Sequence, residues 1–252
     1  MKIAIVIAAY NESQNIGPLT ERLIETLDSL QGASWKLIYV IEGTDGTVDI
    51  ARGFAARRPE VEILYNERPS GLGVAFRAGF NAVPFDTDFV VTMDADLNHQ
   101  PEEIPRLLDA ALESGADIVV GSRRQHGSSV EGTPVWKAAA SRSVNRIMHL
   151  MMGLRIDDVT SGFRVYRAPA LRRLEFETSG FAFLPEILIR AAAYRFTIVE
   201  RPITFIFRTA GESKMQIGST SFSYLRLFAN HSLRHLLRKD ECQLTSADAA
   251  KE

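Results

Sequence analysis

Residues 89–96 read FVVTMDAD, an apolar run that ends in two aspartates separated by one alanine. A short apolar run rich in β-branched residues predicts a buried strand. Residues two apart in an extended segment point the same way, so the carboxylates of Asp94 and Asp96 are expected on one side of the chain. Two carboxylates placed like this can share a hard divalent cation, Mg²⁺ or Mn²⁺, which in turn neutralises a diphosphate. A solvated loop or a helix cap is the alternative interpretation.

The strand pattern recurs along the first half of the chain and alternates with helical periodicity. Helices are predicted to start near Ser13, Val48, Gly71 and Pro101, between strands at 3–8, 36–41, 61–65, 89–93 and 117–120. This alternation predicts an α/β fold, a mostly parallel sheet with helices on both faces. Ligands bind at the carboxyl ends of such strands. The polar groups expected there are Tyr10-Asn11-Glu12, Glu42, Asp94 with Asp96, and Ser122-Arg123.

The second half has a different pattern. Helices are predicted over 134–152, 185–194 and 219–238, with strands at 196–200 and 203–207 and a further short strand entered through the turn Ser161-Gly162-Phe163-Arg164. We find no internal repeat and no linker. The chain is therefore divided into a catalytic domain over 1–215, an amphipathic helix over 216–239 and a disordered tail over 240–252.

Charge is unevenly distributed. Residues 1–121 carry 9 Lys and Arg against 19 Asp and Glu, whereas residues 122–252 carry 20 against 12. An acidic half suits metal binding, and a basic half suits an anionic partner such as a phosphate or a membrane surface. Ordinary variation of surface charge is the alternative. Nothing points to a nucleic-acid partner.

Cysteine and histidine give little support to other chemistries. The single cysteine, Cys242, excludes a disulfide within the chain, does not support a cysteine zinc site and fits a cytosolic compartment. The five histidines show no ligand spacing. No apolar run is long enough to span a membrane, and the first strand is not followed by the cleavage pattern of a signal peptide.

Other side chains suit a nucleotide ligand. Glu12 and Glu42 follow the first two strands, where a carboxylate can accept hydrogen bonds from a base or ribose. Glu12 can also simply complement a helix dipole. Gly71-Leu72-Gly73 is no dinucleotide fingerprint, because the third glycine is misplaced and the motif follows the third strand. Its glycines permit close approach to a ligand or close helix packing.

Basic side chains in the second half suit phosphate. The guanidinium fork matches phosphate oxygens, and a lysine acts as a point charge. Each candidate taken singly can equally be a surface charge. The turn Gly211-Glu212-Ser213-Lys214 is more suggestive, because it presents a hydroxyl and an ammonium together. The candidates are Arg123, Arg142, Arg208 and Lys214.

These motifs occur together in a familiar order. They are Ala9-Tyr10-Asn11-Glu12, Glu42-Gly43-Thr44-Asp45-Gly46-Thr47, Gly71-Leu72-Gly73-x-Ala75, Asp94-Ala95-Asp96-Leu97-Asn98-His99, Gly121-Ser122-Arg123, Ser161-Gly162-Phe163-Arg164 and Arg208-x-x-Gly211-x-Ser213-Lys214. The set resembles family 2 inverting glycosyltransferases over about residues 3–215. Within that family it resembles the dolichol-phosphate mannosyltransferase, or polyprenyl-phosphate glycosyltransferase, group.

The resemblance implies a GT-A-type nucleotide-diphospho-sugar transferase fold and a set of site roles. Asp94 and Asp96 would bind Mg²⁺ or Mn²⁺ and the donor diphosphate, and Arg123 with Arg142 would hold the acceptor phosphate. The other donor contacts would come from Tyr10, Glu12, Glu42, Gly73, Ala95 and Asn98, with Arg208, Ser213 and Lys214 closing over the phosphates. Asp96, Arg123, Arg142 and Lys214 would carry the catalytic roles.

The implied reaction is metal-dependent, inverting transfer of a hexose to a polyprenyl or dolichyl phosphate. GDP-mannose is the favoured donor and UDP-glucose the alternative. The choice of base stays open, because the family commonly has two aspartates and a longer turn where this chain has Ile41-Glu42. Ala9 also stands where the family often has proline.

Three other functions remain as alternatives. A glycosyltransferase that acts on a sugar hydroxyl would need a dedicated general base, whereas a phosphate oxygen is already anionic and needs little help. A non-catalytic nucleotide-binding regulatory protein does not need the Asp-x-Asp pair. A nucleotidyltransferase would carry a glycine-rich basic signature after its first strand, which this chain lacks.

A lipid acceptor would be met at a membrane. Segments 134–152 and 219–239 mix apolar and basic residues, as helices that lie in the membrane interface do. We therefore expect peripheral contact at the cytoplasmic membrane face. The same segments can instead pack on the sheet or form a dimer interface.

Overall fold

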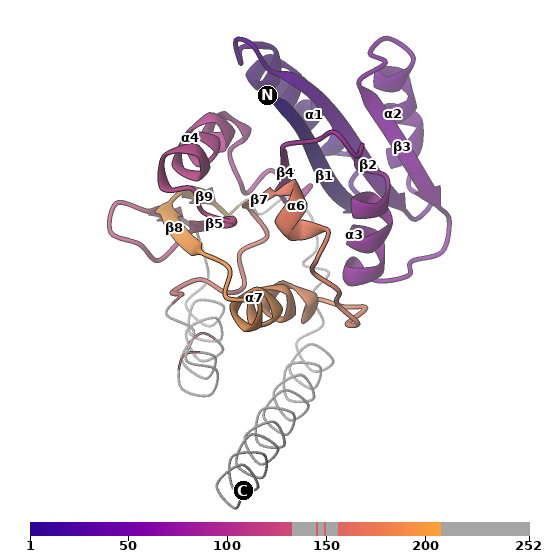
Figure 1. Ribbon diagram of the computed structural model, residues 1–252. Helices are drawn as coiled ribbons and strands as arrows, with labels where there is room; N and C mark the ends of the chain where they lie inside the picture. Colours follow the sequence, from indigo (N-terminus) through magenta and orange to yellow (C-terminus); the bar gives the residue numbers. More distant parts are fainter. Residues whose placement is uncertain (133–144, 146–148, 150–155, 208–252) are drawn as a thin grey trace, which may run out of the picture.

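The computed structural model describes residues 1–132, 145, 149 and 156–207. These residues form a seven-stranded sheet with the strand order β3-β2-β1-β4-β7-β5-β8. Figure 1 shows β3 with helix α2 (Thr47–Ala55) at one end of the molecule and β8 with α4 (Ile104–Ser114) at the other. The strands are β1 (Lys2–Tyr10), β2 (Ser34–Glu42), β3 (Val61–Asn66), β4 (Phe89–Thr92), β5 (Ile118–Ser122), β7 (Arg164–Arg167) and β8 (Ile198–Pro202).

The sheet is parallel except at one strand. β1 pairs in parallel with β2 and β4, and β5 pairs in parallel with β8. β7 lies between β4 and β5 and is antiparallel to both. The predicted α/β class with a mostly parallel sheet is therefore confirmed. The position of β7 is not apparent from the sequence, because it pairs with β4 across more than seventy residues of chain and no local pattern encodes such a pairing.

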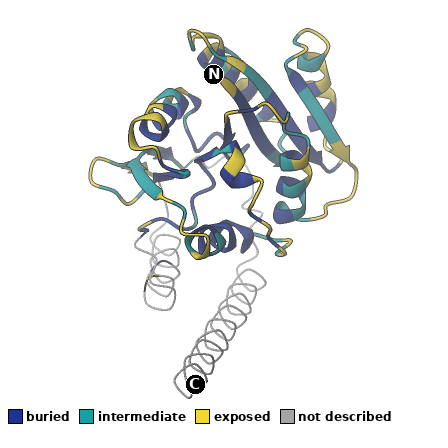
Figure 2. Ribbon diagram, in the orientation of Figure 1, coloured by how far each residue is buried: buried dark blue, intermediate teal, exposed yellow. Residues whose placement is uncertain are grey.

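Helices cover both faces of the sheet. Alternate residues of β1 explain this, because Ile3, Ile5 and Ile7 join one apolar cluster, whereas Ala4 and Val6 join the other. The first face is covered by α1 (Ile16–Asp28), α2 and α4, and the second by α3 (Leu72–Asn81), α6 (Ala168–Leu171) and α7 (Phe183–Ala193). In Figure 2 the inner strands are mostly buried, and the edge strands β3 and β8 are more exposed.

The turn after β2 joins the ends of the first two strands. A carboxylate oxygen of Asp45 accepts the backbone N–H of Thr47 at 3.0 Å, and the other accepts that of Ser13 at 3.0 Å. The Thr47 hydroxyl in turn accepts the N–H of Glu12 at 2.8 Å. The turn is therefore more than a connection, because its side chains fix the residue that follows β1.

A second, smaller sheet consists of β6 (Ser129–Glu131) and β9 (Thr204–Ile206) in parallel. The sequence predicts β9 but not β6, which is exposed throughout and carries no apolar alternation. β9 also contacts the loop after β4, since the N–H of Ile206 donates to the Asn98 carbonyl at 3.0 Å and His99 bridges to Phe205. The small sheet thereby joins the last described strand to the Asp-x-Asp loop.

α3 packs its backbone directly on the sheet at Gly79. A Cβ at Gly79 would lie 2.3 Å from Cγ1 of Val6 and 3.1 Å from Cγ2 of Val40. We expect Gly79→Ala to lower the free energy of unfolding by about 1–3 kcal/mol, because the added methyl forces the valines apart. The measurement is urea unfolding followed by circular dichroism.

Gly53→Ala is the matched control. Gly53 is an exposed residue of α2, and a Cβ there meets nothing within 4 Å. Its replacement should raise the free energy of unfolding by roughly 0.5–1 kcal/mol through helix propensity. The close-packing explanation is wrong if the two variants change stability in the same direction.

Candidate active site

The candidate site lies at the carboxyl end of β4. After Thr92 the residues Met93, Ala95 and Leu97 are buried in the core, and the alternation turns Asp94 and Asp96 to the other side. Leu97 has φ +61°, a left-handed conformation that is uncommon for a residue with a branched side chain. Its burial holds this strained turn in place, and such strain collects at functional sites.

The two aspartates repel each other. Burial raises the pKa of Asp94, and the charge of Glu12 raises it further. Burial also raises the pKa of Asp96 to about 6, with the Asp94 charge as the next cause. Removing water from two neighbouring carboxylates disfavours their charged forms. A cation between them would reverse this effect, so the electrostatics suit a metal site.

The donor set fits a magnesium or manganese ion that is shared with a substrate. Within the described residues no group of three or more His, Cys, Asp or Glu side chains is arranged to hold a metal. The Asp94 and Asp96 carboxylates are the pair that the sequence predicts as metal ligands. Mg²⁺ is commonly held by one or two carboxylates together with substrate phosphates and water.

Asn98 is hydrogen-bonded to the Asp96 carboxylate through both its backbone and its side chain. Its backbone N–H donates to one oxygen of the Asp96 carboxylate at 3.1 Å, and its side-chain amide donates to the other at 2.5 Å. Asn98 is also nearly buried, at 8% exposure. Asn98, which the resemblance places among the donor contacts, thus orients the Asp96 carboxylate.

The loop before β7 packs against Asp94. A Cβ at Gly162 would lie only 2.6 Å from Oδ1 of Asp94, so a larger residue there would displace the carboxylate. The loop is held by Arg164, which is fully buried and donates to the carbonyls of Ser161 and Val159 at 2.8 Å each. The Ser161–Arg164 motif was noticed in the sequence, but its contact with Asp94 emerges only in the fold.

Arg123 is anchored at the same edge by Asp158. Its Nε and Nη2 donate to the two oxygens of the Asp158 carboxylate at 2.7 Å each, and Nη2 also donates to the Thr160 hydroxyl at 2.9 Å. Asp158 is fully buried, while the Arg123 side chain keeps 23% exposure. The guanidinium charge also lowers the pKa of Asp94. Sequence reasoning missed Asp158, whose only signal is an acidic pair in the basic half of the chain.

The residues predicted to contact the donor occupy neighbouring strand ends. Tyr10 is 40% exposed at the end of β1, and Glu12 accepts the side-chain amide of Asn15 at 2.7 Å. Glu42 is 5% exposed and accepts the N–H of Ser70 at 3.0 Å as well as its hydroxyl. In this structure, then, Glu42 organises the loop after β3.

Gly73 has a packing role. Its N–H donates to the Ser179 carbonyl at 2.7 Å, and a Cβ there would lie 2.1 Å from the Thr178 carbonyl oxygen. The glycine therefore lets the start of α3 touch the loop before α7. Its predicted contact with the donor stays a prediction. The remaining predicted residues, Arg142, Arg208, Ser213 and Lys214, lie outside the described residues.

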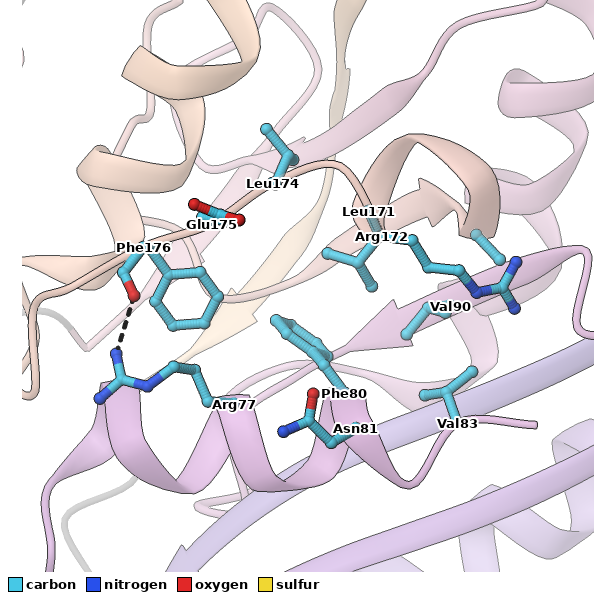
Figure 3. Close-up of a pocket in the computed structure, with 11 residues that line it drawn as sticks. Arg77, Phe80, Asn81, Val83, Val90, Leu171, Arg172, Leu174, Glu175 and Phe176 are labelled. Atoms are coloured by element: carbon cyan, nitrogen blue, oxygen red, sulfur yellow. Dashed lines mark hydrogen bonds between the residues drawn. The ribbon is translucent and has the colours of Figure 1, made fainter. Parts of the chain in front are cut away.

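A cavity of about 370 Å³ lies elsewhere, between α3 and the segment that follows β7. Figure 3 shows the rings of Phe80 and Phe176 there, and they meet edge to face with centroids 6.0 Å apart. Arg77 donates to the Phe176 carbonyl at its rim. Val90, in the first half of β4, lines the cavity, whereas neither Asp94 nor Asp96 does. The cavity is thus separate from the acidic edge.

The arrangement of the sheet and its helices is a GT-A-like α/β fold. The crystal structure of glucosyl-3-phosphoglycerate synthase from Mycobacterium tuberculosis, in complex with Mn²⁺, UDP and phosphoglyceric acid, has the same fold. Its TM-score is 0.67 at 20% identity, over 92% of this chain and 77% of that chain.

The sequence comparison is more specific. Residues 4–175 match Glycosyl transferase family 2. The undecaprenyl-phosphate mannosyltransferase of Micrococcus luteus is 38% identical over 222 residues, which are 86% of this chain and 89% of the relative. The polyprenol monophosphomannose synthase of Mycolicibacterium smegmatis is 33% identical over 217 residues, or 84% and 80%. The chain belongs to glycosyl transferase family 2 and is a glycosyltransferase, so the resemblance seen in the sequence is confirmed.

The Asp158–Arg123 pair predicts a pH dependence of stability. Burial by itself raises the pKa of Asp158, but the Arg123 charge and hydrogen bonds bring it to about 2, against an ordinary 3.8. A lowered carboxyl pKa stabilises the fold above the ordinary value, and this contribution is lost as the pH falls towards 2. A shift of nearly two units corresponds to about 2–3 kcal/mol.

We therefore compare the wild type with Asp158→Asn by urea unfolding between pH 5 and pH 2. The wild type should lose about 2 kcal/mol more over this range than the variant. The comparison uses the difference between the two slopes, because other carboxylates titrate in both proteins. Parallel profiles would contradict the ion pair as the source of the shift.

Proposed function

We propose that the protein transfers a hexose, with inversion, from a nucleotide-diphosphate sugar to a polyprenyl phosphate in a Mg²⁺- or Mn²⁺-dependent reaction. GDP-mannose is the favoured donor, and UDP-glucose is the alternative. The observation that carries the proposal is the pair of repelling carboxylates, Asp94 and Asp96, at the carboxyl end of β4. The names of the two bacterial relatives support the sugar and the lipid phosphate.

The residues at the edge suit this chemistry. A bound divalent cation supplies neutralisation of the charge on the leaving diphosphate. Asp94 and Asp96 would hold it, and Asn98 keeps the Asp96 carboxylate in one orientation. Tyr10 and Glu12 lie at the end of β1 on the proposed donor side. The remaining demand is to align the acceptor oxygen with the anomeric carbon, which is a matter of positioning.

Arg123 is the described candidate for the acceptor phosphate. Its guanidinium is preorganised by Asp158 and Thr160 yet stays partly exposed. A fixed arginine fork pairs well with phosphate oxygens. Arg142, and the segment with Arg208, Ser213 and Lys214, are proposed to complete the phosphate contacts, as the sequence predicts.

Asp158 does not suit the general base that a hydroxyl acceptor would need. A hydroxyl needs a general base with a pKa near the working pH. Asp158 lies at this edge, but its pKa is about 2 and both of its oxygens bind Arg123, so it is a poor base. An anionic phosphate oxygen attacks without such help.

The transfer assay uses undecaprenyl phosphate in detergent, Mn²⁺, and either GDP-mannose or UDP-glucose, with the product identified by mass spectrometry. We expect a glycosylated lipid phosphate from one of the two donors. Asp96→Asn should lower kcat/KM by about 100-fold or more, because it removes one charge from the site at nearly constant shape.

Asp109→Asn on the exposed face of α4 is the matched control and should retain full activity. Thermal unfolding of both variants excludes loss of fold as the cause. Full turnover by Asp96→Asn would contradict the metal assignment. Product on a sugar hydroxyl, with none on the lipid phosphate, would favour the alternative acceptor.

Membrane contact is a separate proposal. Among the described residues no helix is both long and apolar enough to cross a bilayer. The sequence assigns segments 134–152 and 219–239 to peripheral contact at the cytoplasmic membrane face. Apart from Asn145 and His149, they lie outside the described residues. The proposal is supported by their composition and by the lipid acceptors named for the relatives.

Co-sedimentation with anionic vesicles tests this contact. The protein should pellet with the vesicles at low salt and be released at high salt, because salt screens the attraction between basic helices and the surface. A protein that stays in the supernatant at low salt, even with polyprenyl phosphate in the vesicles, would contradict peripheral binding.

A further inference from the structure

His99 is buried in an unusual way for a polar side chain. It is 0% exposed, and its ring packs against Phe163 and Phe205 with centroids 5.3 Å away in each case. Neither ring nitrogen has a hydrogen-bond partner within the described part of the chain. Burying a polar group without a hydrogen-bond partner is unfavourable, because the group loses its hydrogen bonds to water. A leucine or phenylalanine would fill this space without that cost.

The imidazole is aimed at the candidate metal site. Its Nδ1 lies 3.5 Å from Oδ2 of Asp94, somewhat beyond the usual range of an N–H···O bond. A shift of about half an ångström would bring the two atoms to that range. On its other side, Asp94 faces Gly162, where an added Cβ would lie 2.6 Å from Oδ1.

The chemistry of the ring agrees with an N–H···O bond to Asp94. A neutral imidazole has one donor nitrogen and one acceptor nitrogen. A carboxylate only accepts, so the nitrogen that faces Asp94 has to be the donor.

We propose that His99 is a positioning residue that donates a hydrogen bond from Nδ1 to Oδ2 of Asp94 and fixes this carboxylate for the divalent cation. The inference rests on the metal dependence in the proposed function. Partners of metal ligands orient the ligand and raise metal affinity, and their loss typically costs 10–100-fold in affinity.

The backbone of His99 gives the position its rigidity. His99 bridges to Phe205 of β9, and the preceding Asn98 carbonyl accepts the N–H of Ile206. The same short segment thus holds Asp96 through Asn98 and Asp94 through His99. Both carboxylates are supported by residues that follow them directly in the chain.

Two variants separate a positioning role from simple core filling. His99→Leu keeps the volume and removes the donor, whereas His99→Asn keeps an amide donor near the position of Nδ1. If His99 positions Asp94, the leucine variant loses affinity for Mn²⁺ by 10–100-fold, and its unfolding temperature without metal is equal or higher. The asparagine variant binds Mn²⁺ with an affinity closer to that of the wild type than the leucine variant does, and it unfolds at a lower temperature than the leucine variant.

Affinity is measured by electron paramagnetic resonance of free Mn²⁺, with GDP or UDP present, and does not depend on turnover. His126→Leu, at an exposed histidine, is the matched control and should bind Mn²⁺ like the wild type. Long-range ¹H–¹⁵N correlation spectra of the wild type with Mg²⁺ give a second measurement. They should show His99 protonated at Nδ1 and not at Nε2.

The outcomes are distinct. A wild type that binds no Mn²⁺ with either nucleotide overturns the proposed metal dependence and this inference with it. A wild type that binds Mn²⁺, together with equal binding by His99→Leu or failed rescue by His99→Asn, overturns the role of His99 alone. Should the variants not fold, a ring protonated at Nε2 in the wild-type spectrum overturns it equally.

Discussion

The structure is organised around two like charges that are forced together. Asp94 and Asp96 lie at the end of a buried strand because Met93, Ala95 and Leu97 between and around them are held in the core. Burial in the core raises both carboxyl pKa values, and the charge of Asp94 raises that of Asp96 further. Such an arrangement is unfavourable by itself and becomes favourable when a cation is shared. The rest of the site serves to keep this pair in one geometry.

The residues that hold the site in place come partly from the same loop and partly from a distant segment of the chain. Asn98 and His99 follow the aspartates immediately, whereas Gly162, Asp158 and Thr160 arrive from more than sixty residues away. The direction of β7 explains the second group. Because β7 is antiparallel to β4 and β5, its first residue lies at the carboxyl edge of its neighbours. The loop before β7 therefore lies beside Asp94. If β7 were parallel to its neighbours, the loop after β7 would lie there instead.

The two anchors of the site differ in electrostatic cost. Arg123 and Asp158 form a buried ion pair with several hydrogen bonds, which keeps the guanidinium in place but makes Asp158 useless as a base. His99 is uncharged and its ring nitrogens have no hydrogen-bond partner among the described residues, so its burial is unfavourable. The Arg123–Asp158 pair has its hydrogen bonds without any ligand. The proposed hydrogen bond from His99 forms only when the Asp94 carboxylate moves closer to the ring. This difference makes His99 the more informative position for probing metal binding.

The sequence by itself determined the α/β class, the positions of β1 to β5, and the strand ends that carry Glu12, Asp94, Asp96 and Arg123. It could do so because these features depend on local periodicity and on the rule that parallel strands end at one edge. The ordered motifs also determined the family, which the comparisons confirmed. The tertiary structure decided what each side chain contacts. Glu42 is hydrogen-bonded to Ser70, Gly73 to Ser179 and Arg123 to Asp158, and His99 lies beside Asp94. The first three pairings join residues far apart in the chain, which local patterns do not relate, and the Arg123–Asp158 pair depends on where the chain that enters β7 returns to the edge of the sheet. His99 is close to Asp94 in sequence, but its ring is held by Phe163 and Phe205 from distant segments.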